Sequence, residues 1–366
     1  MKSHDEIIHS DMYTVNLSAI IYGAYTRKEV LYDLVYNTYS NSSIAESTDL
    51  NVFIDINSVI HALYSENNRV LFTNITDISS GLINMCAHYR SFFRELGVQT
   101  KFFLINSLNI CNINRKFVAD YNGEFLRKTT ISNLNGVINN NMQLLKVLCP
   151  YLPGIYFIDT HENYETAVII AHLIEILNDG HPNLIISHDT YPLQLTALYP
   201  WTSYLYPSKY KGADVSWMLP ISEKPGYREV FWNTIAQHRK VNPELLKRIS
   251  PINYPLLNAC IAYKERNMKG ILTTVKAVEL VEAIVGGTDI KVQPSQLLDN
   301  PEIISKYPVG AIESRYKALD ISYMLPFYRN SPEAKNIQLL DLDDSATVNK
   351  ISSKYYSNNP LDLLRL

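Results

Sequence analysis

The sequence lacks the features that mark several large classes of protein. No apolar run approaches the roughly 20 residues that a membrane span needs, and the first residues, MKSHDEIIHSDMY, are too polar and acidic for a signal peptide. Glycine is scarce, and the one adjacent pair, Gly286-Gly287, follows a helical pattern, so a glycine-rich phosphate loop is absent. We therefore expect an intracellular soluble protein, without a membrane partner or a dinucleotide site of that kind.

Cysteine and net charge are also low. The four cysteines, Cys86, Cys111, Cys149 and Cys260, lie far apart and match no paired zinc spacing, which predicts free thiols in a reducing compartment. The formal net charge is -3, so the chain as a whole does not attract nucleic acid. Any such partner must be held by a local basic surface.

What the sequence does contain is typical of a large folded protein. Its 366 residues are 46% hydrophobic and 19% charged, enough to bury a sizeable core. The 26 tyrosines and the many Asn and Ile residues are typical of an AT-rich genome, which points to a virus or phage and, if so, to host cytoplasm or virion. This bias carries no information about mechanism.

Short apolar runs alternate with helical patterns along the chain, an order typical of a parallel α/β sheet. We predict strands over 51–56, 100–105, 154–158 and 183–186, and helices over 58–64, 78–96, 131–148, 164–177, 256–263 and 275–285. Two segments are rich in Lys and Arg, 112–128 and 207–248. Each is explained equally well by a solvated face or by a nucleic-acid surface.

Three acids stand at comparable places in this pattern. Asp55 ends the first strand, Glu165 opens the helix after the third, and Asp189 follows the fourth, so a parallel sheet brings them to one edge. Converging carboxylates repel unless a cation neutralises them, and such oxygen ligands select Mg²⁺ or Mn²⁺. Metal ions held this way hydrolyse phosphodiesters, which would make the protein a nuclease. Alternatively, Asp189 caps the next turn and Glu165 is only the negative charge favoured at a helix start.

The order of the segments resembles the flap endonuclease and 5′→3′ exonuclease superfamily over residues 50 to 290. The matching stretches are VFIDINSVIHAL (52–63) for the first strand and acid, FLINS (103–107) for a strand ending in an acid, RKFVADYNGEFLRK (115–128) for a basic stretch that holds DNA, YETAVIIAHL (164–173) for the acidic helix, IISHDTYPLQL (185–195) for an acid-rich turn, and 256–281 for a helix–three-turn–helix motif.

The resemblance implies an α/β fold: a PIN-like domain over 49–205, with a central mostly parallel sheet flanked by helices, and a helical helix–three-turn–helix-like region over 206–290. Residues 1–48 would be an N-terminal extension and 291–366 a C-terminal extension or tail. The implied catalytic residues are Asp55, Glu165, Asp189 and Asn106, the first three as metal ligands. The implied contacts to the backbone of DNA or RNA, without sequence specificity, are Arg115, Lys116, Tyr121, Arg127, Lys128, Lys269, Gly270, Thr273, Thr274 and Lys276.

The chain also departs from the family. The remaining acidic positions of the family fall here on Asn106, Ala167, Val168, Tyr191 and Tyr263. Asp159, Glu162 and Asp214 are conceivable substitutes, although caps or solvated loop charges explain them more simply. With so few carboxylates, one weakly held Mg²⁺ or Mn²⁺ is expected rather than two.

Three functions remain open at this stage. The first is a nuclease fold with impaired or lost catalysis that binds nucleic-acid backbone. The second is an active metal-dependent 5′ nuclease whose acidic site is rearranged. The third is a structural protein of a viral assembly, with other proteins of that assembly as its partners.

Overall fold

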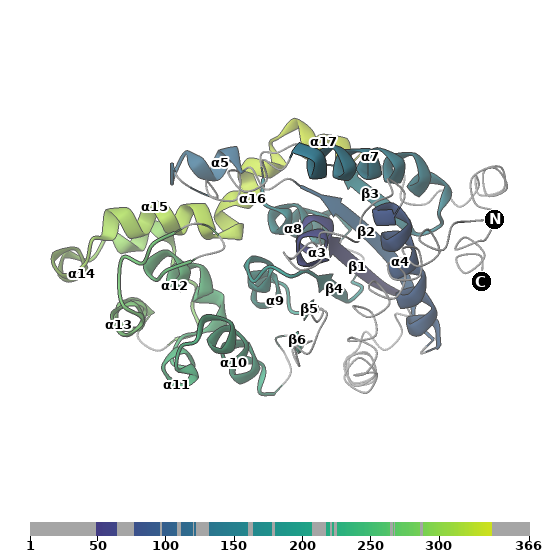
Figure 1. Ribbon diagram of the computed structural model, residues 1–366. Coiled ribbons are helices and arrows are strands. Elements are labelled where there is room, and N and C mark those ends of the chain that lie inside the picture. Colours follow the sequence, from purple (N-terminus) through teal and green to yellow (C-terminus); the bar gives the residue numbers. More distant parts are fainter. Residues whose placement is uncertain are drawn as a thin grey trace.

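The computed structural model describes residues 49–63, 77–95, 97–107, 111–119, 121, 132–159, 164–177, 180–206, 217–219, 222, 225–263, 266, 268–285 and 288–338 (Figure 1). Several features predicted above lie outside these residues, namely the N-terminal extension 1–48, Arg127, Lys128, Glu162, Asp214 and the chain beyond 338. Among the residues described, no helix combines the length and the hydropathy needed to cross a membrane.

A six-stranded sheet forms the centre of the fold, in the order β3-β2-β1-β4-β5-β6. Its strands are β1 (Asp49–Asp55), β2 (Gln99–Asn106), β3 (Ile155–Asp159), β4 (Asn183–Ile186), β5 (Thr202–Tyr206) and β6 (Trp217–Leu219). The first five run parallel, and β6 pairs antiparallel with β5. The strands β2 and β3 are added on one side of β1, and β4 to β6 are added on the other side. In open parallel sheets, ligand-binding and active sites lie at such a switch point.

The sheet separates the hydrophobic core into two clusters, one on each face. Val52 and Ile54 of β1 face one core with side chains of α4 (Asp77–Glu95) and α7 (Ser132–Leu148). Phe53 of β1 and Ile185 of β4 face the other core, which contains α8 (Thr166–Leu177). Successive strand residues point to opposite faces, and both faces of β1 are covered, which is why its sequence is a continuous apolar run rather than an alternating one.

The remaining elements form a helical region beside the sheet (Figure 1). It contains α10 (Tyr227–Arg239), α11 (Pro243–Leu246), η4 (Pro251–Asn253), α12 (Tyr254–Cys260), α13 (Thr274–Val285), η6 (Pro294–Leu297), α14 (Pro301–Lys306) and α15 (Val309–Leu319). From α15 the chain returns to the sheet through α16 (Ile321–Arg329) and α17 (Pro332–Gln338) (Figure 1). Helix α15 packs on α12, and α16 packs on α8. The chain from 291 to 338, expected as an extension or tail, is therefore largely helical and shares the core of the sheet.

Short helices complete the fold at the edge where the parallel strands end. They are α3 (Ile56–Leu63) directly after β1, α5 (Asn112–Arg115) after β2, and η3 (Tyr191–Leu193) with α9 (Gln194–Leu198) after β4; η2 (Cys149–Tyr151) lies at the opposite edge, before β3.

The predicted fold class, α/β with a central mostly parallel sheet flanked by helices and a helical C-terminal part, is confirmed. The predicted helix over 256–263 is shorter than expected, because α12 ends at Cys260 and the chain turns into a hairpin closed by a bridge between Tyr263 and Met268.

Candidate functional site

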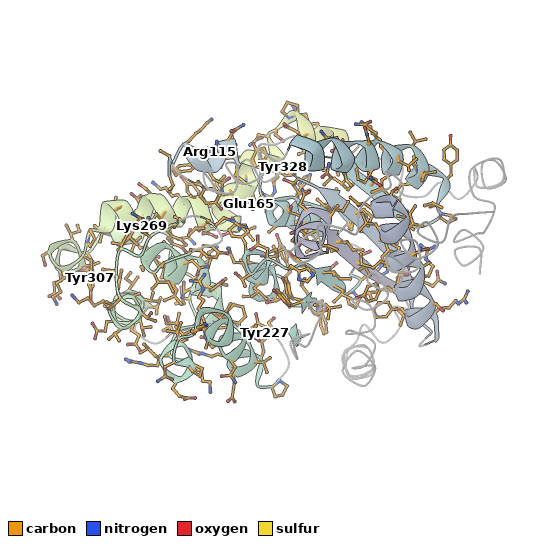
Figure 2. The ribbon with its side chains drawn as sticks, in the orientation of Figure 1. Arg115, Glu165, Tyr227, Lys269, Tyr307 and Tyr328 are labelled. Atoms are coloured by element: carbon orange, nitrogen blue, oxygen red, sulfur yellow. The ribbon has the colours of Figure 1, made fainter. Side chains whose placement is uncertain are left out.

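The three predicted acids lie on segments that meet at the carboxyl edge of the sheet. Asp55 is the last residue of β1, Asp189 follows β4, and Glu165 directly precedes α8. Asp55 and Glu165 are each 1% exposed, and Asp189 is partly buried. Figure 2 labels Glu165 between the sheet and the helical region. The three acids therefore lie at the predicted edge of the sheet, but Asp55 and Glu165 are out of contact with solvent.

An arginine joins Glu165 to Asp189. Arg266 Nε donates a hydrogen bond to Glu165 Oε1 at 2.7 Å, and its Nη2 donates to Glu165 Oε2 at 3.0 Å and also to Asp189 Oδ2. The Arg266 side chain is 6% exposed. A buried cation is thus already present where the sequence predicted a metal ion between these carboxylates.

Arg266 is positioned by the hairpin that follows α12. Tyr263 and Met268 exchange backbone hydrogen bonds at 2.9 and 3.0 Å, and Arg266 N donates to Tyr263 O at 3.1 Å. The backbone N–H groups of Ile271 and Leu272 both donate to Cys260 O at 2.9 Å. These bonds fix the hairpin against the end of α12, so the guanidinium is directed at the acids by backbone geometry.

Two tyrosines flank the guanidinium. The Arg266 guanidinium carbon lies 4.9 Å from the ring centroid of Tyr191 and 5.7 Å from that of Tyr263. Arg239 lies 4.6 Å from the centroid of Tyr263, and contacts of this kind favour a desolvated cation. The rings of Tyr191 and Tyr263 therefore stabilise the buried guanidinium between the carboxylates.

The electrostatics of the site favour a permanently charged Arg266. Burial alone would lower the pKa of Arg266, but the charges of Asp189 and Glu165 outweigh burial and raise that pKa well above the usual arginine value. Tyr121 OH donates a further hydrogen bond to Glu165 Oε1 at 2.7 Å. Both oxygens of Glu165 are therefore used inside the protein.

Asp55 makes hydrogen bonds of its own, apart from those of Arg266. Its Oδ2 accepts from Ser187 Oγ at 3.0 Å, and its Oδ1 accepts from Ser58 N at 3.3 Å. Ser187 Oγ also accepts from Asp189 N at 3.1 Å, which links the two acids. Burial, with a smaller contribution from the charge of Asp189, raises the pKa of Asp55 to about 6. This direction is expected for a buried carboxyl group without a cation beside it.

The predicted capping role of Asp189 is confirmed, and its second carboxylate oxygen is bound by Arg266. Its Oδ1 accepts from Tyr191 N at 3.0 Å, the capping role that is common for aspartate after a strand. Its Oδ2 accepts from Arg266. One oxygen therefore shapes the turn, while the other belongs to the acidic site.

Asn106 is held by its neighbours at the end of β2. Its Nδ2 donates to Asp159 Oδ1 at 2.9 Å, and its Oδ1 accepts from Asn57 Nδ2 at 3.5 Å. Asp159 is exposed and sits beside Asn106 in the β2–β3 register. The oxygen of Asn106 that could contact a metal ion is directed at Asn57.

These contacts do not fit a divalent metal ion. Among the residues described, no group of three or more His, Cys, Asp or Glu side chains is arranged to hold one. Glu165 and Asp189 bind Arg266 instead, and Asp55 is buried under two serines. The role of Asp55, Glu165 and Asp189 as ligands of one Mg²⁺ or Mn²⁺ stays a prediction, and the cation that faces Glu165 and Asp189 in this structure is the guanidinium of Arg266.

The predicted basic stretch is divided between surface and core. Lys116 is exposed, and Arg115, labelled in Figure 2, donates from Nε to Tyr121 O at 3.1 Å. Tyr121 is fully buried and bonded to Glu165, so its predicted contact with nucleic acid is wrong. Its side chain supports the acidic site instead.

The predicted residues of the helix–three-turn–helix-like motif lie around the hairpin and the start of α13. Lys269, Gly270, Thr273 and Lys276 are exposed, and Thr274, the first residue of α13, is partly buried. Thr273 Oγ1 accepts from Lys276 N at 3.4 Å. A Cβ atom at Gly270 would lie 3.1 Å from the backbone nitrogen of Ala262, so a larger residue there requires this segment to shift by a few tenths of an ångström.

Most described cations of the segment 207–248 are paired with acids. Arg228 lies 3.1 Å from Asp289, and Lys247 lies 2.6 Å from Glu244. Arg248 Nε donates to Glu282 at 2.6 Å. These pairs favour the interpretation of the segment as a solvated, charge-balanced face.

Arg266 is a site residue that was not predicted from the sequence. The residue lies in a polar turn, YKERNMKG, beside Lys264 and Lys269, and nothing local distinguishes it from them. The available signal was indirect. Carboxylates buried without enough partners for a metal ion require another cation, and aromatic rings are common partners of a buried cation.

No protein-family model and no curated protein sequence matches this chain. Similar solved structures include the flap endonuclease of bacteriophage T5, as a pseudo-enzyme–product complex with DNA and metal ions, at 10% identity and a TM-score of 0.46, covering 75% of this chain and 90% of that one. The T5 5′-exonuclease with bound zinc matches at 12% identity and a TM-score of 0.46, covering 76% and 90%. The T5 D15 protein co-crystallised with metal ions matches at 8% identity and a TM-score of 0.47, covering 75% of this chain and 91% of that one.

Proposed function

We propose that this chain is a divergent protein of the 5′-nuclease fold that binds the backbone of DNA or RNA and does not cleave it by metal-dependent hydrolysis. The observation that carries the proposal is the position of Arg266, which bonds both oxygens of Glu165 and one oxygen of Asp189. In a metal-dependent nuclease of this fold, those carboxylates would face the catalytic ion.

A guanidinium cannot replace that ion in the reaction. A metal ion acts by binding a water, lowering the pKa of that water, and stabilising the leaving oxygen. Arginine offers only donors, holds its proton at any ordinary pH, and has no position at which water is activated. Expelling Arg266 to admit a metal ion would break a buried ion pair, at a cost of about 3–5 kcal/mol.

Binding of nucleic acid rests on a different surface, at the hairpin and the start of α13. Lys269 and Lys276 are exposed there, and the 12-residue helix α13 begins at Thr274. Helix N-termini attract phosphate through free N–H groups and the helix dipole, and lysines add charge. Such contacts read no bases and weaken as salt rises.

The test measures cleavage and binding on the same samples. Purified protein is incubated with 5′-labelled flap, single-stranded and duplex DNA and RNA in Mg²⁺ or Mn²⁺, beside Asp189→Ala. We expect no cleavage above that of Asp189→Ala, together with binding that falls with salt. Cleavage by the wild type that disappears in Asp189→Ala would establish the rearranged nuclease instead.

Reversing the charge of two lysines tests whether the hairpin and the start of α13 form the binding surface. Lys269→Glu with Lys276→Glu should weaken binding to every sequence alike and lower the slope of log affinity against log salt by about two. The control is Lys306→Glu, an exposed lysine at the end of α14, which should leave both unchanged. If the wild type binds no nucleic acid at low salt, the proposal fails and the assembly-protein function becomes the better account.

A further inference from the structure

Three aromatic side chains form a cluster where α5 meets α16. Phe117 lies 5.8 Å from Tyr323 and 6.2 Å from Phe327, and Tyr323 lies 5.8 Å from Phe327, measured between ring centroids. We call these three residues the aromatic platform. Phe117 follows α5, whereas Tyr323 and Phe327 stand one turn apart on α16, so the platform joins segments that are about 200 residues apart (Figure 1).

The platform reaches the surface. Phe327 is 43% exposed, and Phe117 and Tyr323 are partly exposed. Packing against the core accounts for the inner edges of Phe117 and Tyr323, but it does not account for a phenylalanine ring presented to water beside them. An exposed ring that stands beside two partly exposed rings forms an aromatic surface, and such surfaces mark interaction sites.

Hydrogen bonds from buried groups fix both halves of the platform. The buried Asn114 of α5 donates from Nδ2 to Ala318 O at 2.6 Å, at the end of α15. Tyr164 OH donates to Phe327 O at 3.1 Å, which holds α16 against the segment before α8. The rings are therefore presented by a rigid frame, so that a ligand stacking on them loses little of its binding energy to ordering the protein.

Among the residues that the structure describes, positively charged side chains lie beside the platform. Lys116 is exposed and directly precedes Phe117, and Arg115 Nε donates to Tyr121 O at 3.1 Å. Lys317 Nζ lies 5.9 Å from the ring centroid of Tyr323, although it also pairs with Glu313 at 2.7 Å. The combination of aromatic faces with cations at their margin suits a polymer that carries both flat bases and phosphates.

We infer that the aromatic platform stacks the unpaired bases of single-stranded nucleic acid, with Lys116 contacting a phosphate. The inference rests on the proposed function in that the ligand is a nucleic acid, and it adds a single-strand site distinct from the hairpin and α13. Duplex bases are stacked on one another and cannot lie on the rings, so the platform discriminates between single and double strands.

The experiment compares Phe327→Ala with the wild type by fluorescence anisotropy, using labelled oligothymidine and oligouridine and a duplex of equal length. Stacking of one base predicts a roughly 5- to 150-fold loss of single-strand affinity. Duplex affinity and the salt dependence should stay unchanged, since no phosphate contact is lost. Val147→Ala, at an apolar residue of α7 that is 62% exposed, is the matched control and should change nothing.

Two further variants separate stacking from a loss of structure. Phe327→Trp keeps a ring, so it should retain single-strand binding. Lys116→Ala should lower the slope of log single-strand affinity against log salt by about 0.7. If Phe327→Ala and the wild type bind single strands with equal affinity, the inference is overturned. If both still bind the duplex, the proposed function holds even though the stacking site does not. If the wild type binds neither form, both fail together.

Discussion

Arg266 bonds Glu165 through two parallel hydrogen bonds, Nε to Oε1 at 2.7 Å and Nη2 to Oε2 at 3.0 Å. This fork-to-carboxylate geometry is the strongest that a protein ion pair adopts, and only arginine among the side chains provides it. Because the pair is buried, with Glu165 1% exposed, water does not compete for the bonds. The two residues stand 101 positions apart and hold the hairpin after α12 against the start of α8.

Replacing Arg266 should be strongly destabilising. Arg266→Met keeps most of the side-chain volume but leaves Glu165 and Asp189 without their cation, and breaking a buried pair from one side costs about 3–5 kcal/mol. The free energy of unfolding is measured by urea denaturation. Arg329→Met, which removes an exposed pair with Glu175, is the control and should lose less than about 1 kcal/mol. Equal losses in the two variants would show that the buried fork has no special role.

Asp55 should make stability depend on pH in an unusual direction. Its pKa rises from 3.8 to about 6 on folding, so between these values the folded state holds a proton that the unfolded state has lost. The contribution of Asp55 to stability therefore falls as pH rises from about 4 to about 6, by about 3 kcal/mol in total, and is constant above that.

Asp55→Asn removes this titration. The variant should be more stable than the wild type at pH 8, by up to about 3 kcal/mol, and the difference should shrink toward pH 4. Chemical denaturation of both proteins across this range gives the result. A constant difference between the two curves would contradict the raised pKa of Asp55.

Gln194 should be needed to hold the C-terminal helices. Its Nε2 donates to Leu319 O at 3.0 Å, and its Oε1 accepts from Ile321 N at 3.3 Å, so one buried amide satisfies both sides of the α15–α16 junction. Gln194→Ala leaves two buried backbone groups without this partner and should cost about 2–4 kcal/mol. Gln143→Ala, at an exposed residue of α7, is a glutamine control. Unchanged stability and unchanged hydrogen exchange at Ile321 would show that the junction is held by packing alone.

Much of the fold could be predicted from the sequence because the relevant signals are local. The run NLII predicts β4 over its observed bounds, and polar residues after each apolar run mark the strand ends. Parallel topology then brings Asp55 and Asp189 to one edge whatever their chemical role. These expectations required only the period of a strand and the geometry of a sheet.

The chemistry of the site could not be predicted in the same way. Whether converging acids bind a metal ion or an arginine depends on a contact between residues 101 positions apart, and no local pattern specifies that contact. Tyr121 shows the same limit, since an aromatic residue among basic ones suggests a surface, yet its ring is buried and its hydroxyl bonds Glu165. Long-range partners decide both cases.

The central claim, that Arg266 takes the place of a metal ion, is tested most directly by Mn²⁺ binding. Paramagnetic resonance of free Mn²⁺ is followed while wild type and Arg266→Met are titrated at neutral pH, with Arg266→Met in combination with Asp189→Ala as the control. We predict no saturable site in the wild type, and a site in Arg266→Met that is lost in the control, because the vacated carboxylates then need a cation. Saturable binding by the wild type that Asp189→Ala abolishes would contradict the account.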